Sequence, residues 1–142
     1  MYSLIYNGKL YYGLLRGDMV ELRSFTKDDD GFKLDNDFRY IKYINKNECL
    51  NMKKVWFFTE CSGERLMIEG IDYRMQDLFT VSIGGWTDNY KWYNIEALPK
   101  YYLVFEDYFN PKEENKIYLT KDNVVNYAKI FCRKMDKDMV VC

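Results

Sequence analysis

The sequence predicts a mainly β protein with one α-helix near its C-terminus, an α+β fold. Short apolar and aromatic runs separated by turn residues indicate antiparallel strands, and Asn7-Gly8 is the strongest hairpin signal in the chain. A single stripe of apolar residues at helical spacing follows Thr120. The 142 residues, 48% of them hydrophobic, suffice for one domain or for two small repeats with a shared core.

The first part of the chain reads as a series of strands. We expect strands at residues 2–6, 9–15, 19–25, 38–44 and 55–58. The triplet Arg16-Gly17-Asp18 has the chemistry of a turn between the second and third strands. Residues 26–31 form a polar, acidic stretch that we expect to be a loop.

A second stretch of the chain echoes the first at a spacing of about fifty residues. Gly8 corresponds to Gly63, and Glu48 corresponds to Glu96 before an aromatic strand. Each copy reads as a small curled antiparallel sheet or SH3-like barrel, and neither buries enough surface alone, so the two should pack together. We expect one globular unit made of a first β repeat, a second β repeat, and a short strand with the C-terminal helix, at residues 1–60, 61–114 and 115–142.

The C-terminal segment predicts a strand at 117–119 followed by a helix. Thr120 is a good N-cap residue, and Arg133 and Lys134 suit the negative end of a helix. One helical face would carry four apolar side chains: Val124, Ala128, Phe131 and Met135. Such a stripe usually packs on the core, although it can also bind a partner.

The overall charge argues against several classes of ligand. The formal net charge is −1, from 21 basic and 22 acidic residues, so the basic surface that duplex nucleic acid requires is missing. The chain has no histidine, and its four cysteines have no metal-ligand spacing, so we expect no metal and no cofactor. It also has neither a long apolar run nor a signal-like start, so we expect a cytoplasmic protein without membrane contact.

The lack of histidine also argues against most enzyme chemistry, because Ser-His and Cys-His nucleophile systems cannot be built. We expect a protein that is not an enzyme. A carboxylate pair, as in glycoside hydrolysis, stays open as an alternative. Its candidates are Glu69, Asp72, Asp77, Glu96 and Glu106.

Two acidic clusters are candidate partner-binding surfaces. The first contains Asp28, Asp29, Asp30, Asp35 and Asp37, and the second contains Glu106, Asp107, Glu113 and Glu114 around Tyr108 and Phe109. Local negative charge steers and holds a basic partner surface. For each cluster a merely solubilising loop is the competing interpretation.

Aromatic side chains are dense between residues 86 and 109. Tyrosine and tryptophan are enriched at the energetic centres of protein interfaces. Together with Asp88, the residues Trp86 and Trp92 are therefore candidates for the contact surface. Packing within the sheet and a groove for a base or sugar are the alternatives.

Short aromatic and polar motifs recur in the two predicted repeats. They are Asp30-Gly31-Phe32-Lys33, Tyr40-Ile41-Lys42-Tyr43 and Asn47-Glu48 in the first, and Tyr90-Lys91-Trp92-Tyr93 with Glu96 in the second. In these motifs the chain resembles the small tandem-repeat immunity proteins that accompany bacterial polymorphic toxins. The resemblance covers roughly residues 5–109, and the C-terminal helix departs from the pattern.

The resemblance implies a non-catalytic protein that binds a cognate toxin domain and covers its active site. The partner would then be a toxin domain with a basic surface, and the acidic clusters and exposed aromatics would contact it. The alternative is an anti-defence protein of a phage or mobile element, which binds a host defence protein or sequesters a signalling nucleotide.

Overall fold

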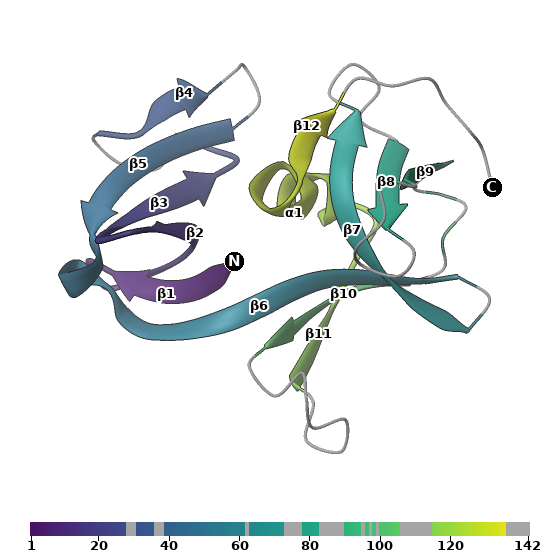
Figure 1. Ribbon diagram of the computed structural model, residues 1–142, viewed down its shortest axis with the longest axis horizontal. Helices are drawn as coiled ribbons and strands as arrows, with labels where there is room; N and C mark the ends of the chain where they lie inside the picture. Colours follow the sequence, from purple (N-terminus) through teal and green to yellow (C-terminus); the bar gives the residue numbers. More distant parts are fainter. Residues whose placement is uncertain are drawn as a thin grey trace. The chain divides into compact units, whose positions relative to one another are not determined.

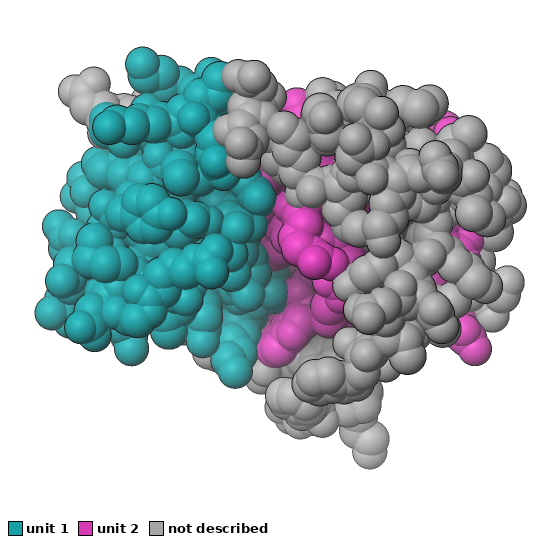
Figure 2. Space-filling model, turned by 45° about the horizontal axis from the view of Figure 1, so that its top comes forward, with its two compact units in different colours: residues 1–55 teal, residues 56–142 magenta. Residues whose placement is uncertain are grey.

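The computed structural model describes residues 1–27, 31–35, 39–61, 63–72, 78–82, 90–94, 96, 98, 100–105 and 115–135. Within them the chain is mainly antiparallel β-sheet with one C-terminal helix, so the predicted fold class is confirmed (Figure 1). The chain divides into two compact units, Met1–Val55 and Trp56–Cys142, which Figure 2 colours separately.

The first unit is a sheet with the strand order β4-β5-β3-β2-β1-β6. Its elements are β1 (Tyr2–Tyr6), β2 (Lys9–Arg16), β3 (Met19–Ser24), β4 (Lys33–Asp35), β5 (Arg39–Asn45), the 3-10 helix η1 (Lys46–Glu48) and β6 (Leu50–Cys61). Asn7 and Gly8 have φ of 50° and 77°, which is the left-handed backbone that a tight hairpin turn between β1 and β2 needs.

The core of the first unit lies on one face of this sheet. Alternate residues of β3, Val20 and Leu22, are fully buried there. They pack with other buried side chains from β1, β2, β5 and the loop before β4, namely Leu4, Tyr11, Phe32 and Ile44.

One position in this sheet departs from regular pairing. Ser3 lies opposite Lys53, but Ile5 lies opposite Leu50, so β6 has one more residue than β1 between the two pairs. Asn51 absorbs the extra residue with a φ of 54°. The irregularity is a β-bulge, and asparagine is among the residues that tolerate this backbone conformation.

The second unit has the strand order β9-β8-β7-β6-β10-β11. It uses the later part of β6 together with β7 (Glu64–Asp72), β8 (Leu78–Ser82), β9 (Tyr90–Asn94), β10 (Lys100–Phe105) and β11 (Asn115–Leu119). The helix α1 (Val124–Phe131) and the strand β12 (Arg133–Met135) follow, and β12 pairs with β7 in parallel.

The helix packs on one face of the second sheet. The rings of Phe131 and Phe57 are 5.8 Å apart, and Val124, Ala128 and Ile130 are buried. Cys132, directly after the helix, is fully buried, with its Sγ 3.9 Å from the carbonyl oxygen of Ile68. The core-packing interpretation of the apolar stripe therefore holds for its first part.

Three sequence-based expectations need correction. The helix ends at Phe131, so Arg133, Lys134 and Met135 lie in β12, where pairing with β7 replaces the helical bonds. The N-cap position is Asn123, whose carbonyl accepts the bond from the amide of Tyr127, and Thr120 lies in the turn before it. The strand expected at 55–58 is the longer β6, which pairs in both units.

Candidate functional site

A charged cluster lies on the face of the first sheet opposite its core. Because side chains alternate along a strand, Glu21 and Arg23 of β3 point away from Val20 and Leu22. Both charged residues are buried, with 6% of Glu21 and 9% of Arg23 exposed. Buried charges are stable only when paired, so the surroundings of Glu21 decide what this face can do.

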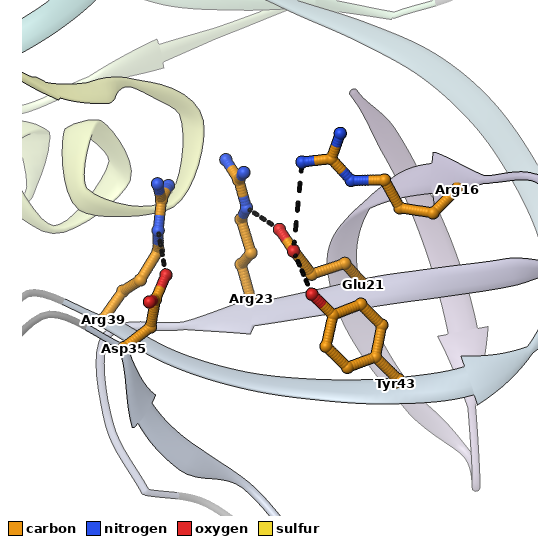
Figure 3. Close-up of polar contacts among 6 residues, drawn as sticks. All are labelled: Arg16, Glu21, Arg23, Asp35, Arg39 and Tyr43. Atoms are coloured by element: carbon orange, nitrogen blue, oxygen red, sulfur yellow. Dashed lines mark hydrogen bonds and ion pairs between the residues drawn. The ribbon is translucent and has the colours of Figure 1, made fainter.

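Glu21 holds three neighbours through its carboxylate, as Figure 3 shows. Arg23 donates from Nε to Oε2 at 2.8 Å, and the hydroxyl of Tyr43 donates to Oε1 at 2.8 Å. Nη2 of Arg16 is 4.0 Å from Oε1. Glu21 and Tyr43 lie opposite each other in the β3–β5 pairing, so the sheet register itself brings the phenol to the carboxylate.

Opposing effects act on the pKa of Glu21. Burial raises the pKa, but the hydrogen bonds from Tyr43 and Arg23 and the positive charges of Arg23 and Arg16 lower it by more, so the pKa lies below its usual value. The carboxylate is therefore ionised at neutral pH. Its hydrogen bond raises the pKa of Tyr43 in turn, because it favours the protonated phenol.

A second ion pair extends the cluster to the edge of the sheet. Nε of Arg39 on β5 is 3.9 Å from Oδ2 of Asp35, its partner in the β4–β5 register. Arg39 is buried, with 8% exposed. The six residues in Figure 3 include three arginines and two carboxylates, which gives 3 − 2 = +1 for this group.

Three side chains in or beside this cluster are exposed to solvent. The side chain of Arg16 is 57% exposed, and Met19 and Tyr43 are 39% and 53% exposed. Arg16 and Met19 are opposite each other in the β2–β3 pairing, and Met19 precedes Glu21 by two residues on the same face. We call Arg16, Met19, Glu21, Arg23 and Tyr43 the β3 face.

The surroundings of Glu21 on the β3 face favour its charged form. A general acid needs a raised pKa at neutral pH, whereas that of Glu21 is lowered and its charge is balanced by Arg23.

Within the described residues no three histidine, cysteine, aspartate or glutamate side chains come together to hold a metal ion. Nor does any helix in the described part of the chain have the length and apolar character needed to cross a membrane.

Of the partner-binding residues expected from the sequence, two lie in described parts of the chain. Asp35 is half-buried and paired with Arg39. Trp92 lies in β9 opposite Thr80. The others lie outside the described residues: Asp28, Asp29, Asp30, Asp37, Trp86, Asp88, Glu106, Asp107 and Tyr108.

Three tyrosines of the aromatic stretch have a clear role. Tyr93, Tyr101 and Tyr102 are buried, with 7%, 2% and 0% exposed. Burial raises the pKa of Tyr101 strongly, with a further contribution from the charge of Glu96. For these three residues, sheet packing accounts for the aromatic density.

The β3 face itself was not anticipated from the sequence. Residues 19–25 read as an apolar run, yet Glu21 and Arg23 have opposite charges two positions apart. In a strand this spacing places both on one face, and that signal could have identified the ion pair. The bond to Tyr43 depends on the β3–β5 register, which no local pattern reveals.

Comparison with known proteins gives no match for this chain, whether to a protein-family model, to a curated protein or to a solved structure.

Proposed function

We propose that this chain is a non-catalytic inhibitor that binds another protein, and that its partner docks on the β3 face. In line with the resemblance described above, we propose a bacterial toxin domain as this partner. The chain would then act as an immunity protein that covers the toxin's active site. The observation that carries the proposal is an exposed tyrosine fixed by a buried ion pair.

The fixed geometry favours binding because it lowers the entropy lost on association. An exposed tyrosine or arginine normally loses rotamer freedom when a partner covers it. Here the hydroxyl of Tyr43 is bonded to Glu21, which Arg23 holds from the other side. Tyrosine, arginine and methionine are also enriched in interface cores. The exposed Arg16, Met19 and Tyr43 match that composition.

We further propose that the two units are copies of one SH3-like repeat. The strand order β5-β3-β2-β1-β6 in the first unit has the counterpart β9-β8-β7-β6-β10 in the second. Asn45 at the end of β5 accepts a bond from the amide two residues on, and Asn94 at the end of β9 does the same. Aligning Asn45 with Asn94 shifts the two copies by one residue relative to the sequence alignment of Glu48 with Glu96.

The experiment has two stages. The genes neighbouring this one in its source genome are expressed singly in a test strain, and growth is followed with and without this protein. We expect one neighbour to arrest growth and this protein to restore it. The purified pair should then form a one-to-one complex whose dissociation constant is measured by calorimetry.

Variants of the β3 face complete the test. Tyr43→Ala should weaken the complex by roughly 30-fold or more, as expected for an interface hot spot, and Tyr43→Phe by less because the ring stays. The matched control is Leu34→Ala, which removes an apolar side chain that is 51% exposed on β4 and distant in register from Glu21. Equal affinities for all variants would contradict docking on this face, and growth arrest without rescue would contradict the immunity function.

A further inference from the structure

The strand β11 forms one end of the second sheet. Among the described strands it pairs only with β10, so no described strand covers its other edge (Figure 1). Four of its five residues are exposed, including Ile117 at 51% and Tyr118 at 58%. An edge strand of this kind is a template for pairing with another chain.

Proteins usually protect such edges with short strands, charges, prolines or bulges. β4, the edge of the first sheet, follows this rule, since it has three residues, two of them the charged Lys33 and Asp35. β11 has five residues, a regular register with β10 and a single charge at Lys116. This edge is therefore more open to strand addition than that of β4.

Side-chain contacts with Tyr102 on β10 also hold β11 in place. The ring of Tyr118 is 5.5 Å from that of Tyr102, which is fully buried, and Nζ of Lys116 is 5.1 Å from the centre of the Tyr102 ring. The hydroxyl of Tyr102 accepts a bond from Nε of Arg65 at 2.9 Å. A partner strand would thus meet an ordered edge, and ordering β11 would cost little on binding.

The two faces at this edge differ in chemistry. Lys116 and Tyr118 share a face with Lys100 on β10, and Glu60 and Arg65 belong to the same group through their contacts with Lys100 and Tyr102. The charges of this group sum to 3 − 1 = +2. The opposite face of β11 presents Asn115, Ile117 and Leu119, so it is mainly apolar.

From these observations we propose that β11 accepts an extended segment of a partner protein as an added strand, with acidic and apolar residues in alternation. The acidic side chains would lie beside Lys116, and the apolar ones beside Ile117. A second copy of this chain fits less well, because pairing two β11 edges would bring two positively charged groups together. This site is separate from the β3 face and does not depend on the immunity function.

The test uses the full chain and a defined probe. A capped nonapeptide of alternating glutamate and valine is titrated into the ¹⁵N-labelled protein at low salt, and a lysine–valine peptide serves as the probe control. We expect the glutamate–valine peptide to shift the backbone resonances of residues 115–119 and to slow their amide exchange at least threefold. Lys116→Glu should weaken binding about tenfold, and Ile117→Lys should abolish it.

The matched control is Leu34→Lys, which places the same charge at an equally exposed residue of β4 and should leave peptide binding unchanged. Thermal melts show whether each variant is folded. Four results would overturn the proposal. No perturbation of β11, or equal or tighter binding of the lysine–valine peptide, would contradict the addition of an acidic strand. Self-association that Ile117→Lys removes would indicate a second copy as the partner, and displacement of the peptide by an oligouridine would indicate RNA.

Discussion

The hydroxyl of Tyr43 donates a 2.8 Å hydrogen bond to Oε1 of Glu21 on the neighbouring strand. Because a charged acceptor strengthens a hydrogen bond, Tyr43→Phe should lower the free energy of unfolding by roughly 1–2 kcal/mol. Urea denaturation followed by circular dichroism measures this loss. The control Tyr118→Phe alters an exposed phenol on β11, so its expected change is below about 0.5 kcal/mol.

The ionised Glu21 makes stability depend on acid pH. Its folded pKa lies below the unfolded value of about 4.3, so the folded state favours the charged form. This stabilisation is present above the unfolded pKa and is lost as the pH falls through the folded pKa. Unfolding measured from pH 7 to pH 3 should show this decline, and Glu21→Gln should flatten it while lowering stability at pH 7. An unchanged slope in the variant would assign the decline to other carboxyl groups.

The turn after β5 is stabilised by a capping box. The Asn45 side chain accepts a bond from the amide of Asn47, and the Glu48 side chain accepts one from the amide of Asn45. Asn45→Ala should therefore cost about 1 kcal/mol. The control Asn47→Ala keeps both bonds, because only the backbone of Asn47 takes part, and equal losses for the two variants would contradict this account.

Gly13 marks a close approach between β2 and β3. A Cβ at this residue would lie 2.8 Å from Cγ1 of Val20 and 2.9 Å from the carbonyl oxygen of Glu21. Gly13→Ala should destabilise the protein by roughly 1–3 kcal/mol, since the backbone must move to relieve the contact. Gly63→Asn is the control for an added side chain without a steric contact, because a Cβ there meets nothing within 4 Å; its φ of 80° adds some backbone strain, which asparagine bears better than most residues. A tolerated Gly13→Ala in denaturation experiments would show that the strands can separate locally.

Cys132 reports on how tightly the C-terminal elements are held. Its thiol is fully buried, whereas Cys49 is half-buried, with its pKa raised by burial and by the nearby Glu48 charge. Iodoacetamide should modify Cys132 on the order of 100-fold more slowly in the native protein than in urea. Peptide mapping by mass spectrometry resolves each cysteine, and Cys49 should show a smaller protection. Rapid native labelling of Cys132 would indicate frequent opening of α1 and β12.

Local sequence patterns predicted β1, β2, β3 and β5 of the first unit, but neither β4 nor the full length of β6. The residues 2–6 correspond to β1, and the left-handed Asn7 and Gly8 form the turn that their chemistry indicated. Such features depend on neighbouring residues alone, through side-chain alternation and the backbone preferences of glycine and asparagine. The coarse fold class follows from the same signals.

The features that were missed depend on distant parts of the chain. The apolar stripe through Met135 favoured a longer helix, but β12 pairs with Gly70 to Asp72 of β7, which local periodicity does not reveal. The β3 face requires Tyr43 to lie opposite Glu21. The pattern of charges in β3 could have suggested the Glu21–Arg23 pair, but not the exposed tyrosine that it fixes.

β6 has a consequence for how the chain is made. Its first residues, Leu50 to Lys54, pair with β1, and the same uninterrupted strand continues to Cys61, where it pairs with β7. On the ribosome all strands of the first sheet are outside once Lys54 has emerged, before β7 has emerged to pair with the later part of β6. The continuation of that anchored strand then gives the next hairpin a fixed edge on which to form. The strand that is made last for the first sheet is thus the strand on which the second sheet begins.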